Sequence, residues 1–436
     1  MNLVRSPSIK IAISVLILFT DAWAQTTDIP FTLDSAVQIS IGRSPKVRAI
    51  EAKLEEARAL RGASRAQFMP RLGIAAGMEK NPAVSETSER VAYGYATWNL
   101  FNGFADRRIT QMASFEVTRS ELELSAAKFA LSLEVEAQFF KILGAMRSVK
   151  EWTEASALNS SALKDVRMRR GAGMASEGDY VAFEVRQARI DSELADAKSS
   201  VELEKAAFNR LIGHEMGQKI VFNGFIPRYA INEPLDQILA NAHQNSFALR
   251  EVGIEVAKSE VESARWISGA LPRVDFEARN GWLPLGERPT SKTNADAPAT
   301  AFLLTAKMDV FSGLSTVNER RAALARKTQS DEKLREASAD LLSRVERHVR
   351  RLAVLEQRLR VESENSVKTL KYKETTAREY RAGVKTGPDY ASAIDLAIDS
   401  RRRYVDSLLA WHDERFGLEN AIGRKVAIKE MANEEK

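Results

Sequence analysis

The sequence predicts a mainly α-helical protein built from two similar halves, each with one long antiparallel helical hairpin and one β-hairpin. Three observations predict this fold class. The chain repeats its own motifs in the same order, long proline-free segments carry an apolar seam at helical spacing, and shorter segments between them alternate polar and apolar residues. The repeating unit is far longer than the roughly 20 to 50 residues of a solenoid repeat, so it indicates a duplicated half-molecule.

The repeated motifs divide the chain. Pro70-Arg71 recurs as Pro272-Arg273 at a shift of 202 residues, and Leu100-Phe101-Asn102-Gly103 recurs as Val310-Phe311-Ser312-Gly313 at a shift of 210. The eight extra residues of the second half must lie between these motifs. We expect a signal peptide over residues 1–24, a first repeat over 25–213, an inter-repeat segment over 214–232, a second repeat over 233–423 and a C-terminal tail over 424–436.

The N-terminus is typical of a secretory signal peptide. Arg5 and Lys10 precede an apolar run over residues 11–19, and Ala22-Trp23-Ala24 forms a cleavage site of the small-x-small type. The apolar run is about half of the ~20 residues that a spanning helix needs. The chain has no cysteine, which excludes disulfides, thiol catalysis and a lipidated N-terminal cysteine. Export without disulfides suits a protein of the bacterial cell envelope.

Charge and composition argue for long solvated helices. Charged residues make up 28% of the chain and are interspersed, and the net charge is only +5 at pH 7, which disfavours a nucleic-acid partner. Aromatic residues make up 7%, so a single large globular core is not expected. The sequence shows no catalytic triad, phosphate-binding loop, dinucleotide-binding turn or metal-ligand spacing, so we expect neither an enzyme nor a cofactor.

Helical elements are expected in this order. Residues 33–67 read as one helix of eight to nine turns that ends at Pro70. Residues 104–169 follow without a proline, and a continuous helix of that length would extend ~100 Å. Turns that contain glycine, near 171–179 and 383–389, then reverse the chain toward Leu211 and Ala421. The apolar seams repeat every three to four residues, as in a coiled coil, at Leu122, Ala126, Phe129, Leu133, Ala137 and Phe140, and at Leu341, Val345, His348, Leu352, Leu355 and Leu359.

β-Hairpins are expected at about 70–101 and 272–311, where the period of the pattern falls to two. Strands of about 9 to 11 residues with one apolar face, joined by polar connectors, are typical of transmembrane β-barrels. Four strands cannot close a barrel, and open edges are not tolerated in lipid, so the barrel must be shared between chains. Trp98 and Trp282 are either residues of an aromatic girdle at a membrane interface or buried core.

These features together resemble the TolC family of outer-membrane efflux and secretion channels. The resemblance rests on the signal peptide, the duplicated halves, the helix-to-strand switches at Pro70 and Pro272, the strand ends at 98–103 and 309–313, and the Gly-x-x-Ser/Thr-x-x-Asp turns. It implies a homotrimer whose twelve strands form one barrel in outer-membrane lipid and whose helices form a periplasmic tunnel. It also implies a small mixed domain, formed by residues 214–232 and the tail, around the middle of the tunnel.

The resemblance implies a passive exit duct in a tripartite efflux pump or a type I secretion system. Its partners would be a periplasmic adaptor (membrane fusion) protein and an inner-membrane transporter of the ABC or resistance-nodulation-division type. Two alternatives from other classes are a periplasmic adaptor itself and a coiled-coil scaffold of the cell envelope. An adaptor should also contain lipoyl-type and barrel domains, which the sequence does not show, and a scaffold would not explain the four alternating strands.

The resemblance places the gate in the two glycine-containing turns. As local structure, each turn should close one helix with a glycine and begin the next with a capping box, Ser176 to Asp179 and Thr386 to Asp389. Tyr380 and Asp179 match a tyrosine–aspartate link that holds the tip closed. Lys385 matches an arginine that bonds a threonine, although Gly178 replaces that threonine, and Asp389 matches an acid that rings the entrance, while Ser392 replaces the second acid. The turn residues Gly173, Met174, Gly383 and Val384 would dock the adaptor.

Overall fold

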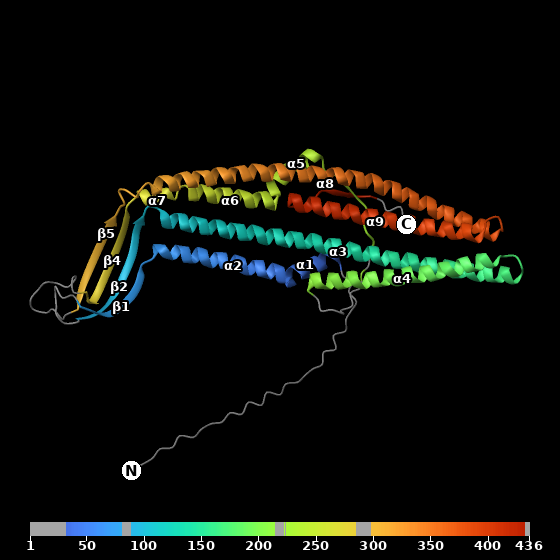
Figure 1. Cartoon of the computed structure of the whole chain (residues 1–436), viewed down its shortest axis with the longest axis horizontal. Helices are drawn as coiled ribbons and strands as arrows, with labels where there is room; N and C mark the ends of the chain where they lie inside the picture. Colours follow the sequence, from blue (N-terminus) through green and yellow to red (C-terminus); the bar gives the residue numbers. More distant parts are fainter. Residues whose placement is uncertain (1–31, 81–88, 214–221, 223, 285–297, 432–436) are drawn as a thin grey trace, which may run out of the picture.

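The structure is a computed structural model, and it describes residues 32–80, 89–213, 222, 224–284 and 298–431. The molecule is elongated, with strands at one end and helices that run to a tip at the other (Figure 1). The predicted signal peptide at 1–24 and most of the connectors within the two β-hairpins lie outside the described residues.

Two long helical hairpins form most of the molecule, as predicted. Helices α3 (Ala105–Gly171) and α8 (Ser315–Arg381) have 67 residues each, and each is followed by a returning helix of 36 residues, α4 (Glu177–Ile212) or α9 (Gly387–Ile422). The apolar seam of α8 is buried at Leu341, Val345, Leu352 and Leu359. Burial of one apolar stripe per helix stabilises such hairpins more than helix propensity does.

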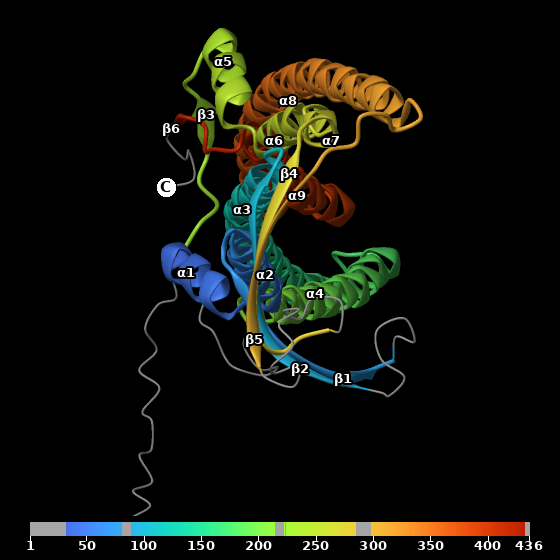
Figure 2. The same cartoon turned by 90° about the vertical axis from the view of Figure 1, so that its left-hand side faces the viewer.

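Shorter helices extend this layer toward the strands. They are α2 (Pro45–Arg65), α6 (Phe247–Ser263) and the single turn α7 (Trp266–Ala270), with a 3₁₀ turn, η1, at Ala66–Phe68. Two further helices, α1 (Leu33–Arg43) and α5 (Leu235–Asn245), lie beside the middle of the layer (Figure 2). Helix α2 packs on α3, and α6 packs on α8. In the half of the molecule nearest the tip, α3 contacts both α4 and α9, and α9 contacts α8. The lateral order of the layer there is therefore α4, α3, α9, α8.

The prediction of one continuous helix over residues 33–67 is wrong. The helix breaks at Ser44, whose backbone is extended with φ −60° and ψ 120°. A residue that precedes proline disfavours the helical conformation, and Pro45 at the first turn of α2 has no N–H to donate. The Ser44 hydroxyl accepts a hydrogen bond from the N–H of Val47 at 3.4 Å, so Ser44 caps the second helix.

The predicted β-hairpins are both present and together form one antiparallel sheet. Its strands are β1 (Arg71–Glu79), β2 (Glu89–Asn102), β4 (Arg273–Trp282) and β5 (Ala299–Lys307), in the order β1-β2-β4-β5. The two hairpins are joined through β2 and β4, with an irregularity in register between Asn99 and Phe101. The outer edges of β1 and β5 have no partner strand within the described part of the chain.

The register separates an apolar face of the sheet from a polar one. Phe276 lies opposite both Trp98 and Leu304, and its ring stacks on Phe302 at 6.3 Å. Asp275 lies on the other face, where it accepts a hydrogen bond from Asn99 at 2.8 Å. The apolar face is exposed at Leu72 (82%), Ile74 (91%), Phe302 (72%) and Leu304 (66%). Trp98 and Trp282 are also about half exposed, which excludes the buried-core alternative and favours the girdle.

A small mixed unit lies beside the middle of the long helices. Strand β3 (Tyr229–Ile231) pairs with β6 (Ile428–Glu430), and both lie with α1 and α5 on one side of the helical layer (Figure 2). The other side of the layer is concave, and the strands and the tips both curve toward it (Figure 2). Next to this unit, Nη2 of Arg415 lies 2.5 Å from Oε1 of Glu136 in a buried ion pair. Lys425, shortly before β6, pairs with the same Glu136 carboxylate.

None of the helices in the described ranges is both long and apolar enough to cross a bilayer.

Candidate functional site at the helical tip

The two turns at the tip are built alike. In the first, the N–H of Asp179 donates to the Ser176 hydroxyl at 3.0 Å, and the Asp179 carboxylate accepts from the N–H of Ser176 at 3.2 Å. The second turn repeats this capping box with Thr386 and Asp389. Both predicted capping boxes are therefore confirmed. Hydrogen bonds from the hydroxyl and the N–H of Thr386 lower the pKa of Asp389 below its ordinary value.

Gly173 and Gly383 close α3 and α8 with left-handed backbones, at φ +74° and +76°. L-residues adopt this conformation at a steric cost, so glycine fits both positions. The neighbouring side chains Met174 and Val384 are each 74% exposed. Both apolar side chains are therefore accessible from solvent at the tip.

Tyr380 is buried at the tip without the link predicted from the resemblance. Its ring is 4% exposed and stacks on Tyr390 at 5.4 Å. The hydroxyl of Tyr380 has no hydrogen-bond partner among the described residues, and burial raises its pKa. The hydrogen bond between Tyr380 and Asp179 is thus not formed in the structure, because the Asp179 carboxylate is turned to Ser176. Whether these two residues contribute to closure stays a prediction.

Arg169 is the residue that approaches Tyr380. Its guanidinium carbon lies 4.9 Å from the centre of the Tyr380 ring, in a cation–π arrangement. The same guanidinium donates to the carbonyl oxygens of Tyr380 at 3.5 Å and Arg381 at 3.4 Å. These carbonyls end α8, where the helix dipole favours a cation. Arg169 of the first hairpin therefore caps the long helix of the second.

A second contact between the hairpins is an ion pair between α4 and α9. Arg186 is 7% exposed, and its Nη2 donates to Asp395 at 3.0 Å. Burial lowers the pKa of Arg186, and the nearby Asp395 carboxylate opposes that shift. The Nε and Nη1 atoms of Arg186 are buried without partners in the described chain. An arginine that is desolvated to this degree depends on its single carboxylate partner.

The third contact is steric. Gly387 begins α9 against the Phe183 ring of α4, and a Cβ at this glycine would lie 2.8 Å from the ring. Any larger residue would separate the hairpins at this point.

Lys385, in contrast, is exposed, and its ammonium makes no ion pair with the described residues. The structure thus brings together Arg169, Phe183, Arg186, Gly387 and Asp395, none of which was predicted from the sequence.

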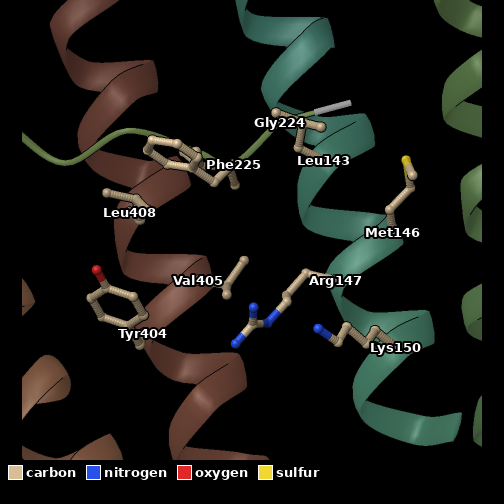
Figure 3. A pocket seen from close by; sticks show the side chains of 10 residues that line it. Leu143, Met146, Arg147, Lys150, Gly224, Phe225, Tyr404, Val405 and Leu408 are labelled. Carbon is tan, nitrogen blue, oxygen red and sulfur yellow. The ribbon is translucent and has the colours of Figure 1, made fainter. Parts of the chain in front are cut away.

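The cavity shown in Figure 3 offers a second place for a functional site. It has a volume of about 370 Å³ and lies between α3 and α9, with Leu143 and Leu408 on its walls and Arg147 and Lys150 at one side. Phe225, from the segment that leads to β3, lies at its other side (Figure 3). The cavity has no carboxylate pair or histidine for acid–base work. Within the described residues, no cluster of His, Cys, Asp or Glu could hold a metal ion.

Comparison with known proteins identifies the family. The model of the outer membrane efflux protein family matches residues 36–214 and 238–424, one segment in each half of the chain. The chain belongs to this family. It is therefore an outer-membrane efflux channel protein and not an enzyme. The family match excludes the adaptor and scaffold alternatives, and the resemblance to the TolC family is confirmed.

Individual relatives agree with the family match. The cobalt-zinc-cadmium resistance protein CzcC of Cupriavidus metallidurans is 23% identical over 326 residues, which cover 69% of this chain and 76% of CzcC. A membrane protein from Pseudomonas aeruginosa has a similar structure, with a TM-score of 0.77, 17% identity and coverage of 90% and 92% of the two chains. The MtrE outer membrane channel of Neisseria gonorrhoeae, in its open state, matches with a TM-score of 0.74, 14% identity and 97% coverage of both chains.

Proposed function

We propose that three copies of this chain form one outer-membrane channel that serves as the passive exit duct of a tripartite efflux pump or type I secretion system. The observation that carries the proposal is the open sheet. Its edge strands β1 and β5 lack partners among the residues that the structure describes, and an exposed strand edge must be paired in lipid. Three copies of four strands supply twelve, enough to close a barrel.

The helical layer supports assembly independently of the sheet. Helices α4 and α8 lie at its two lateral ends, and each presents an exposed stripe at coiled-coil spacing. On α4 the stripe carries Val181 (44% exposed), Val185 (66%) and Leu203 (68%), with small residues between them. On α8 it carries Val354 (66%), Val361 (59%) and Tyr372 (48%). In a closed ring the two stripes of neighbouring copies would face each other and bury their apolar residues.

Disulfide cross-linking tests the ring, because the chain has no cysteine of its own. A variant with Leu203→Cys and Val354→Cys should give covalent dimers and trimers under mild oxidation in outer-membrane fractions. The matched control combines Val354→Cys with Glu202→Cys, since Glu202 lies next to Leu203 and is 74% exposed. If the first variant gives no cross-linked species, or if both variants give the same amounts of dimer and trimer, the interface is contradicted.

We infer that the tip is the gate, and that Arg169 and Arg186 hold it closed. Both arginines join the first hairpin to the second, so the hairpins cannot separate until these contacts break. Opening would then need a partner that engages the tip from outside. The exposed turns with Gly173, Met174, Gly383 and Val384 suit a periplasmic adaptor, and the transporter in the inner membrane would supply the energy.

The predicted gate residues have different parts in this proposal. Asp179 and Asp389 fix the two turns through their capping boxes, and Tyr380 receives Arg169 on its ring. The Asp389 carboxylate accepts hydrogen bonds within its own turn and still adds a negative charge at the entrance, because its lowered pKa keeps it ionised at neutral pH. Lys385 is a surface cation near Asp389, and we expect it to contribute little to closure because exposed pairs are worth ~0 to 1 kcal/mol.

A further inference from the structure

We propose that Phe104 and Leu314 anchor the ends of the strands in the periplasmic edge of the membrane's apolar layer. These two residues are the non-glycine residues of the described chain with a positive φ, and φ is 66° at both. They occupy equivalent positions in the two repeats, at the shift of 210 residues that relates the strand ends. Each follows a glycine and directly precedes a long helix, α3 or α8.

Phe104 and Leu314 form the two elbows at which the chain passes from a strand end into a long helix. Glycine would adopt the backbone conformation of either elbow without strain. A left-handed conformation is costly for a bulky side chain and free of steric cost for glycine. The chain nevertheless places a phenylalanine and a leucine there. Because a large apolar residue follows the glycine of the strand-end motif in both repeats, we infer that the apolar side chains themselves are needed.

Both side chains face away from the protein core. Phe104 is 49% exposed and Leu314 is 61% exposed. The Phe104 ring packs edge-on against Phe101 at 5.2 Å, and Phe101 lies opposite Val274 on the apolar face of the sheet. In the second repeat Leu314 follows Phe311 by the same three residues, and Phe311 is 79% exposed. The apolar face of the sheet therefore continues past the strand ends onto the elbows.

Charged residues mark where this apolar surface stops. Exposed Arg107 follows Phe104 by three residues, and Arg320 and Arg321 are exposed in the second turn of α8. Apolar and aromatic side chains followed by arginines are typical of the boundary between hydrocarbon and headgroups. The inference rests on the outer-membrane location of the family and needs neither the copy number nor the gate.

Nitroxide labelling tests this placement on the full chain in phosphatidylcholine vesicles. Single variants Phe104→Cys and Leu314→Cys are labelled, with Ile74→Cys as the lipid reference and Glu202→Cys as the water reference. Collision with oxygen reports lipid, and collision with a nickel chelate reports water. We expect both elbow labels to show the high oxygen and low nickel accessibility of Ile74.

Two results would overturn the proposal. Nickel accessibility like that of Glu202 would place the elbows in water, and low accessibility to both reagents would place them against a second copy of the chain. If Ile74 itself is accessible to nickel, the membrane location of the sheet fails as well, which distinguishes the two claims.

Glycine substitution provides a test without a label. Leu314→Gly removes the strain together with the side chain, whereas Leu314→Met keeps an apolar side chain. The proposal expects less folded protein in outer-membrane fractions for Leu314→Gly and a wild-type amount for Leu314→Met. Equal or greater recovery of Leu314→Gly would show that the side chain has no anchoring role.

Discussion

At the scale of single residues, the stability of the closed tip depends on the hydrogen-bond partner of each polar group. The Asp179 carboxylate is bound by Ser176 of its own turn, and the buried Tyr380 hydroxyl has no hydrogen-bond partner in the described part of the chain. An unsatisfied buried hydroxyl costs on the order of 1 to 3 kcal/mol, so its removal should not weaken the closed tip. Arg169 contacts the ring and the backbone carbonyl, and both are retained when the hydroxyl is removed.

Tyr380→Phe should therefore leave the conductance of the closed channel unchanged and leave its thermal stability equal or slightly higher. Arg169→Ala, which removes the group that binds the ring and the carbonyls, should raise the conductance. Planar-bilayer recordings and melting curves of the purified variants check both outcomes. A rise in conductance for Tyr380→Phe would show that assembly creates the tyrosine–aspartate link after all.

His412 provides a pH dependence at the same scale. It is 1% exposed, and burial lowers its pKa from 6.5 to about 4, while one ring nitrogen bonds the Pro227 carbonyl at 2.8 Å. Between these two values the unfolded chain binds a proton that the folded chain does not. Stability should therefore fall as the pH drops from 6.5 toward 4, by at most about 3 kcal/mol per chain.

Denaturation of the detergent-solubilised protein at pH 7.5, 6 and 4.5 measures this effect. His412→Gln should flatten the pH dependence, and His243→Gln, at an exposed position on α5, should not. If the two variants follow the same curve as the wild type, His412 is not the residue that titrates.

At the scale of elements, periodicity in the sequence was sufficient for the long helices and the strands. Each of these buries or exposes one face, and that face is visible in the spacing of apolar residues along the element itself. The break at Ser44 was missed because the apolar pattern continues across it, although the Ser-Pro pair carried the signal for it. The contacts between hairpins were not predictable in this way, because the spacing of apolar residues along one helix does not show which other helix packs against it.

The repeat itself held an unused signal for those contacts. Arg169 and Asp395 align with Glu379 and Val185 in the other half, and Gly387 aligns with Glu177. Two copies of one hairpin that meet each other need complementary side chains, so they must differ where they touch. Positions at which the repeats differ in charge or size are thus candidates for contact.

The register of the sheet gives a prediction for an element. Leu304 lies on the apolar face opposite Phe276, and Leu303 lies on the polar face opposite Glu277. Arginine on the lipid face of a barrel costs ~2 to 4 kcal/mol near the middle of the bilayer. Leu304→Arg should therefore reduce the amount of assembled oligomer in outer-membrane fractions, while Leu303→Arg should be tolerated. Normal assembly of Leu304→Arg with loss of assembly in Leu303→Arg would show that the two faces of the sheet are assigned wrongly.

At the scale of the whole molecule, the fold separates a rigid conduit from a breakable closure. The long hairpins are held by continuous apolar seams, whereas the tip joins the hairpins through few contacts, among them the partly buried ion pair between Arg186 and Asp395. Removal of one partner of a buried pair leaves an uncompensated charge and typically costs about 3 to 5 kcal/mol. Since Asp395 is 30% exposed, the effect here should lie below that range.

Single-channel conductance in planar bilayers tests the central claim most directly, with wild-type protein, Asp395→Ala and the control Asp399→Ala. Asp399 lies one turn further along α9, is exposed and makes no ion pair with the described residues, so its loss changes the same charge without breaking the closure. We predict small channels for the wild type and for Asp399→Ala, and clearly larger ones for Asp395→Ala. The absence of channels from folded wild-type protein, or equal conductance in the two variants, would contradict a channel that is closed at its tip by this pair.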